Sequence, residues 1–311
     1  MSWSSETIWN IARRFSCTPV GPLHPVSDSY HFLFVLSFEI WGIYSDSERG
    51  SWKPTTEDDL MRLLDLTNAA KNHEFHTLHA WALSKLQEIF NASGSDLPST
   101  CSSDFFTRLV SVAIQSKAVV PDLLHAATSR WISRIRTKDM PPVPAILCAD
   151  EHKLRELRGV SYYAHLQQIH ETADPAPTGS TAIHLRANPK LSQRQLIQLL
   201  AGHLSLVSYW ERRRARPRKL ECPEWCSDDA HKDCVKVWEE RWHAAAGSRK
   251  VLALASADVL EILATMREVM GHDEEIVRGV GEACRLGGMR LIDRDISDVT
   301  CTLPEHFTGC L

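Results

Sequence analysis

The chain has 311 residues, of which 43% are hydrophobic and 24% charged, as is usual for a globular protein with a buried core. Its net charge of -4 argues against general affinity for nucleic acid, which requires an excess of Lys and Arg. The most apolar run covers about 14 residues, whereas a membrane-spanning helix needs roughly 20. The nine cysteines are widely spaced and odd in number. Reduced thiols in the cytoplasm and/or the nucleus are therefore expected.

The first regular pattern after the N-terminal region is a pair of helices. Thr56 followed three residues later by Asp59 predicts a helix that begins with a capping box. Apolar residues then recur at helical spacing over residues 60–67 and again over residues 78–89, with a polar break at Asn72-His73. The pattern predicts a helical hairpin.

The central stretch from Asp122 to Gln168 shows helical periodicity and no strand-like alternation. Met140-Pro141-Pro142 interrupts it and predicts a stop between two helices, because proline is tolerated only at a helix start. Gly159 is expected to permit a sharp corner before a further helix with an aromatic face. Another helix is predicted at residues 104–120, after a polar linker.

The C-terminal part begins at Leu191 and contains several more predicted helices. Ser192 is expected to cap a long helix that ends near Arg216-Pro217, and Ser256 to cap a later one. Asp273 is expected to start the last helix, which Gly287-Gly288 breaks. Because periodicity fades from Arg294, a disordered tail is predicted for residues 301–311.

Four parts of the chain resemble parts of fungal (basidiomycete-type) BTB/POZ domain proteins. Leu64 to Leu86 is similar to the segment that follows the BTB fold, and residues 32–44 are similar to the last helices of that fold. Residues 157–166 resemble the close of the family's helical extension. Residues 205–214, together with Cys222 to Trp242, resemble its C-terminal part. The residues that carry the resemblance are Trp41, Tyr44, Ala70, Phe75, Trp81, Ala82, Leu83, Leu157, Gly159, Tyr162, Tyr163 and Leu166.

Periodicity and resemblance together predict a mostly α fold, in which stacked short helices and helical hairpins follow a partial BTB-like N-terminal region. The BTB fold itself is truncated at its N-terminus. The expected segments are residues 1–55 (partial BTB-like), 56–170 (BACK-like helical extension), 171–190 (linker), 191–300 (helical region with a Cys/His loop) and 301–311 (disordered tail).

The resemblance implies a non-enzymatic role in protein–protein interaction. Such a protein would be an adaptor between a cullin-type ubiquitin ligase and a client, or a transcriptional regulator. A protein partner is expected, and a homo-oligomer is left open because the family's dimer interface lies in the truncated fold. Nucleic acid and membranes are not expected partners. No nucleophile elbow, paired carboxylates or dinucleotide-binding loop supports an enzymatic function.

The sharpest chemical pattern is a cysteine and histidine cluster, spaced C-x3-C-x4-H-x2-C, in a polar loop between two helices. Its members are Cys222, Cys226, His231 and Cys234. Three thiolates and one imidazole form a closed tetrahedral set for structural zinc, with no open position for catalysis. Alternatively, Cys234 packs under the helix and the others are ordinary loop residues.

A basic run from Arg212 to Lys219 precedes this loop. It fits a nuclear-import or phosphate-contacting patch, or simply the solvated C-terminal end of a helix. A zinc-stabilised nuclear nucleic-acid-binding module is therefore an alternative function. A degenerate, non-functional product of the truncated BTB fold is another.

Overall fold

The structure is a computed structural model that describes residues 54–91, 100–172 and 188–308, apart from residue 225. The chain divides into two compact units, Met1–Thr55 and Thr56–Leu311. Within the described ranges the second unit consists of twelve α-helices and no strand, which confirms the mostly α prediction. The predictions for the partial BTB-like segment, including residues 32–44, fall outside the described residues.

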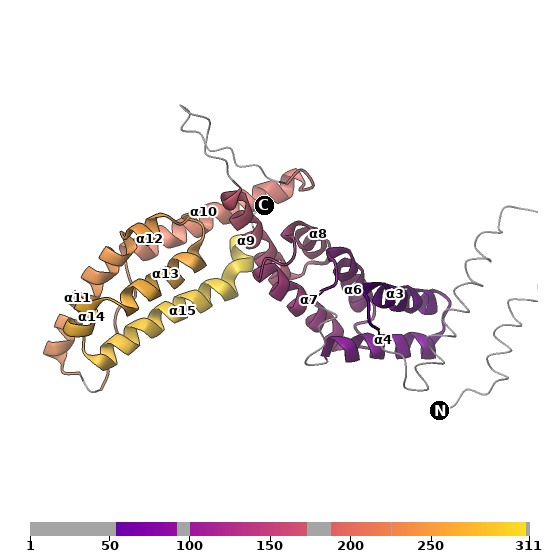
Figure 1. Cartoon of the computed structure of the whole chain (residues 1–311), viewed down its shortest axis with the longest axis horizontal. Helices are drawn as coiled ribbons and strands as arrows, with labels where there is room; N and C mark the ends of the chain where they lie inside the picture. Colours follow the sequence, from indigo (N-terminus) through magenta and orange to yellow (C-terminus); the bar gives the residue numbers. More distant parts are fainter. Residues whose placement is uncertain (1–53, 92–99, 173–187, 225, 309–311) are drawn as a thin grey trace, which may run out of the picture. The chain divides into compact units, whose positions relative to one another are not determined.

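Figure 1 shows the order of the helices along the described parts of the chain. The first six are α3 Glu57–Asn72, α4 His76–Asn91, α6 Ser103–Gln115, α7 Pro121–Arg136, α8 Pro142–His152 and α9 Arg155–Glu171. The remaining six are α10 Gln193–Ala215, α11 Asp228–Ala246, α12 Arg249–Leu252, α13 Val259–Gly271, α14 Glu274–Gly279 and α15 Glu282–His306.

The helix starts that depend on local capping lie close to where the sequence predicts them. Thr56 Oγ1 accepts from the Asp59 N–H at 3.2 Å, and the Asp59 carboxylate accepts from the Thr56 N–H at 3.0 Å. Ser192 and Gln195 form the same reciprocal box at the start of α10. The cap of α13 is Asp258 rather than the predicted Ser256. Each box satisfies N–H groups that a helix cannot pair internally.

The predicted hairpin and the proline stop are both present. Helices α3 and α4 pack against each other, and the leucines of α3 that face inward are fully buried. Helix α7 ends at Arg136, and α8 begins at Pro142. In the described residues, Trp131, Tyr162, Trp238 and Trp242 are buried, which confirms that these aromatic side chains belong to the core.

The predicted corner at Gly159 is wrong, because Gly159 lies inside the continuous helix α9. A Cβ at this position would lie 2.5 Å from the backbone nitrogen of Pro304 in α15. Glycine is therefore needed for the close approach of two helices.

Helix α15 also differs from the sequence prediction. It runs through Gly287-Gly288 without a break and continues to His306, so the disordered tail predicted for residues 301–311 is wrong for residues 301–308. Phe307 is fully buried, and its ring stacks on Tyr162 at 5.3 Å between centroids. This tertiary burial stabilises a segment whose own periodicity is weak. No helix among the described residues is long and apolar enough to cross a bilayer.

Candidate metal centre

The four predicted ligands come from two kinds of structure. Cys222 and Cys226 lie in the segment between α10 and α11, as the sequence suggests. His231 and Cys234 lie on α11 itself rather than in a loop, which corrects the prediction. Ser227 caps α11 by accepting from the Ala230 N–H, so Cys226 immediately precedes the cap. Cys234 follows His231 by three positions, which places both on one face of the helix.

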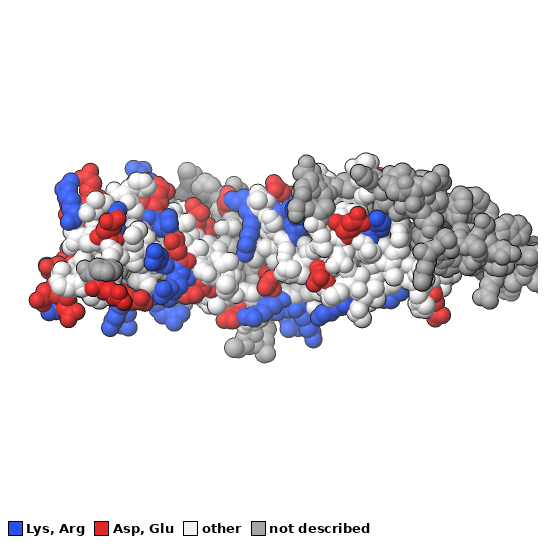
Figure 2. All heavy atoms as spheres, turned by 90° about the horizontal axis from the view of Figure 1, so that it is seen from below, with Lys and Arg blue, Asp and Glu red and all other residues white. Residues whose placement is uncertain are grey.

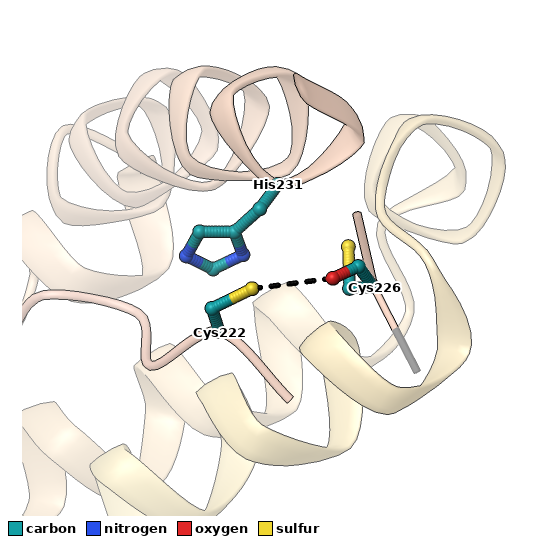
Figure 3. A group of neighbouring side chains, drawn as sticks. All are labelled: Cys222, Cys226 and His231. Carbon is teal, nitrogen blue, oxygen red and sulfur yellow. Dashed lines mark hydrogen bonds between the residues drawn. The ribbon is translucent and has the colours of Figure 1, made fainter. Parts of the chain in front are cut away.

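The ligand atoms of Cys222, Cys226 and His231 lie within 4.8 Å of one another. Figure 3 shows the imidazole of His231 extending from α11 toward the two cysteines of the preceding segment. The Cys222 thiol donates to the Cys226 carbonyl oxygen at 3.4 Å. The local part of the predicted cluster is therefore brought together.

A further cysteine, far away in sequence, joins the cluster. The Sγ atoms of Cys226, Cys234 and Cys284 also lie within 4.8 Å of one another. Cys284 belongs to the first turn of α15, and its Sγ lies 3.5 Å from His231 Nδ1. In the described residues the cluster thus offers four sulfur atoms and one imidazole.

These separations suit a tetrahedral metal ion. With metal–sulfur bonds of about 2.3 Å and metal–nitrogen bonds of about 2.05 Å, tetrahedral geometry puts neighbouring sulfur and nitrogen ligands about 3.6 Å apart. The Cys284 to His231 separation of 3.5 Å matches that edge. The cluster of Cys226, His231, Cys234 and Cys284 could therefore hold a metal ion.

The hydrogen bonds around His231 favour one ring nitrogen as the ligand. Nε2 lies 3.1 Å from the Leu220 carbonyl oxygen, which can only accept, so Nε2 carries the proton. Nδ1 then presents its lone pair, and it is Nδ1 that faces Cys284. A ligating histidine ordinarily has such a backbone partner on its second nitrogen, which fixes the tautomer and the ring orientation.

Backbone groups place partial positive charge near the sulfur atoms. The Gly281 N–H donates to Cys234 Sγ at 3.3 Å. Cys226 and Cys284 lie at the N-terminal ends of α11 and α15, where the helix dipole stabilises thiolates. The N–H donor and the helix N-termini both stabilise the negative charge of a metal-bound thiolate.

Without a cation the Cys284 thiol is costly to ionise. Burial, together with the neighbouring Cys226 and Cys234 thiols, raises the pKa of Cys284 to about 12. Cys234 and Cys284 are buried, Cys226 is half-buried and Cys222 is exposed. A cation among these groups would reverse this tendency, because it stabilises the thiolates directly.

Three side chains of the basic run before the cluster form ion pairs with acidic residues. Arg213 and Arg218 both form ion pairs with the buried carboxylate of Asp295 on α15, at 3.1 and 2.6 Å. Arg218 also pairs with Asp298, and Arg214 with Glu211. Lys and Arg side chains lie among Asp and Glu side chains on the face shown in Figure 2. Arg213 therefore links α10 to α15, and Arg218 links the segment after α10 to the same helix.

In comparisons with known proteins, no family model matches the chain, no curated protein matches its sequence and no solved structure matches its fold. The resemblance to BTB proteins thus stays a prediction from the sequence.

Proposed function

We propose that this chain is a non-enzymatic, helical interaction protein whose C-terminal region is held together by a structural zinc ion. The observation that carries the proposal is a pair of ligand triads that share Cys226, one with Cys222 and His231 and the other with Cys234 and Cys284. The two triads also meet at the 3.5 Å separation of His231 Nδ1 and Cys284 Sγ. Three thiolates and one imidazole are a ligand set that zinc prefers.

The ligand set favours a structural role over a catalytic one. Catalytic zinc keeps one coordination position for water or substrate, whereas four protein ligands close the site. The ligands join three segments: the connection after α10, the face of α11 and the start of α15. Zinc would link elements about 50 residues apart, so its binding free energy adds to the stability of the folded state.

Metal analysis and thermal unfolding of the purified full chain test the zinc proposal. Protein prepared under reducing conditions is expected to carry close to one zinc per chain. Removal of zinc with a chelator should lower the unfolding temperature, and added zinc should restore it. A chain without zinc, whose unfolding is unchanged when zinc is added, would contradict the proposal.

The interaction role has support from an exposed apolar row on α10. Ile197, Leu200 and Leu204 follow one another at helical spacing and are 44%, 58% and 65% exposed. Such side chains on neighbouring turns suit an apolar protein surface. Together with the sequence resemblance, the row supports an adaptor for a cullin-type ubiquitin ligase, or a transcriptional regulator, as the specific role.

A capture experiment with matched variants tests the interaction role. The tagged full chain is compared with the double variant Leu200→Glu/Leu204→Glu and with Leu252→Glu, which changes a leucine of similar exposure on α12. A cullin scaffold or transcriptional component should co-purify with the wild type and Leu252→Glu, but not with the double variant. Recovery of chaperones alone with all three proteins would contradict the role.

A further inference from the structure

The cluster holds one more sulfur atom than a four-coordinate metal ion needs. Once Cys226, His231, Cys234 and Cys284 are assigned to zinc, Cys222 is the additional thiol, and its Sγ stays within 4.8 Å of Cys226 Sγ. We propose that Cys222 is an oxidation site that forms a disulfide with Cys226 and so releases the metal ion. The inference rests on the proposed zinc site and adds regulation to it.

Exposure determines which sulfur an oxidant meets first. Cys222 is exposed and Cys226 half-buried, whereas Cys234 and Cys284 are buried. Solvent access and thiolate character together set how readily a cysteine is oxidised. By access, a small oxidant in solution reaches Cys222 before the other sulfur atoms of the cluster.

The backbone of the pair permits a covalent bond. Neither Cys222 nor Cys226 lies in a helix, and three residues separate them. The Cys222 thiol already points toward Cys226, since it donates to the Cys226 carbonyl oxygen (Figure 3). Closing the disulfide requires the two sulfur atoms to approach, and both cysteines precede the first residue of α11.

The oxidant is a peroxide, and hydrogen peroxide serves as the probe. The Cys222 thiolate attacks one peroxide oxygen, the O–O bond breaks, and the products are a sulfenic acid at Cys222 and hydroxide. The Cys226 thiolate then attacks the Cys222 sulfur, forming the S–S bond and expelling a second hydroxide. Two electrons pass from the sulfur atoms to the peroxide, and both hydroxide ions take up protons to become water.

The disulfide removes Cys226 from the ligand set. His231, Cys234 and Cys284 remain, which leaves zinc with three protein ligands and an open position. Because Cys226 joins the segment before α11 to the metal, its loss removes that link to α15, whereas the ion pairs of Arg218 with Asp295 and Asp298 remain. Reduction of the disulfide restores the thiolate and the complete set.

Peroxide treatment of the zinc-loaded full chain tests the inference. Zinc release is followed with a chromogenic chelator, and disulfides are located by peptide mass mapping. The wild type should release zinc as the Cys222–Cys226 disulfide forms, and a thiol reductant should reverse both changes. Cys222→Ser should keep its zinc before treatment, form no such disulfide and release zinc about tenfold more slowly, because the accessible thiol is missing.

Cys301→Ser is the matched control, since Cys301 is also exposed but lies outside the cluster. It should release zinc at the wild-type rate. Equal release from Cys222→Ser and wild type would overturn the oxidation site while leaving the zinc site intact. Loss of zinc from untreated Cys222→Ser would make Cys222 a ligand and also overturn the inference. If the wild type carried no zinc, both the proposed zinc site and its release by oxidation would be contradicted.

Discussion

Cys284 Sγ lies 3.5 Å from Nδ1 of His231, although 53 residues separate them along the chain. The contact brings the first turn of α15 to the face of α11 that carries Cys234. It completes a ligand set that the local spacing of Cys222, Cys226, His231 and Cys234 only outlines. The cluster therefore depends on tertiary structure rather than on a single loop.

Replacement of Cys284 by serine should weaken zinc binding strongly. The substitution nearly preserves volume but removes a thiolate ligand. Affinity should fall by more than the roughly 10- to 100-fold that the loss of an outer-shell partner costs. Competition with a chromogenic chelator measures the change. Cys301→Ser, on the same helix but outside the cluster, should bind zinc like the wild type, and equal affinity in both variants would exclude Cys284 as a ligand.

The sequence predicts those parts of the molecule that depend on neighbouring residues. The capping box at Thr56 and the N-cap at Ser192 depend on groups three residues apart, and the sequence predicts both. The short spacings from Cys222 to Cys234 likewise predict most residues of the cluster. Cys284 could not be found in this way, because no spacing rule relates it to His231. Only the packing of α15 against α11 brings it close.

The same reason explains the errors at glycines and at the C-terminus. The neighbouring sequence predicts a corner at Gly159 and a helix break at Gly288. In the structure each glycine lies inside a helix, where the missing side chain lets another helix pack closely against it. The end of α15 shows little periodicity, yet Phe307 is buried against Tyr162. Such contacts between distant segments are not encoded in a periodic pattern.

Gly288→Ala should destabilise the packing beside the metal cluster. A Cβ at Gly288 would lie 2.5 Å from the buried ring of Trp238, one helical turn beyond Cys234. Overpacking of this kind costs about 1–3 kcal/mol. Gly287→Ala is the control, because a Cβ at that position meets nothing within 4 Å. It should raise the free energy of unfolding by as much as about 1 kcal/mol, since alanine has the higher helix propensity. Denaturant unfolding compares them, and equal stability would refute the close contact.

Asp295→Asn should cost more stability than Asp298→Asn, because Asp295 forms a buried ion pair and Asp298 an exposed one. The Asp295 side chain is 2% exposed and pairs with Arg213 and Arg218, which are themselves 22% and 26% exposed. Because these arginines are partly exposed to solvent, Asp295→Asn should lower the free energy of unfolding by about 2 kcal/mol. That is less than the cost of removing one partner of a fully buried pair. Asp298→Asn removes a carboxylate that is 52% exposed and pairs with the same Arg218, so it should cost at most about 1 kcal/mol. Similar losses in denaturant unfolding would show that burial of Asp295 adds nothing.

His165 should make the fold sensitive to mild acid. Burial on α9 lowers the pKa of His165 below its ordinary value of 6.5, so the folded state favours the neutral imidazole. Below about pH 6.5 the unfolded chain takes up a proton that the folded chain resists, and stability falls by at most about 1.4 kcal/mol per pH unit until the folded-state pKa is reached.

His165→Gln removes this titration, so its stability should fall less than that of the wild type between pH 7.5 and pH 5.5. Loss of zinc in acid affects both proteins and cancels in the comparison. His125→Gln replaces an exposed histidine and should follow the wild type. Denaturant unfolding at the two pH values measures the difference. If His165→Gln and the wild type lost equal stability on acidification, the buried imidazole would have to be protonated as readily in the folded chain as in the unfolded one.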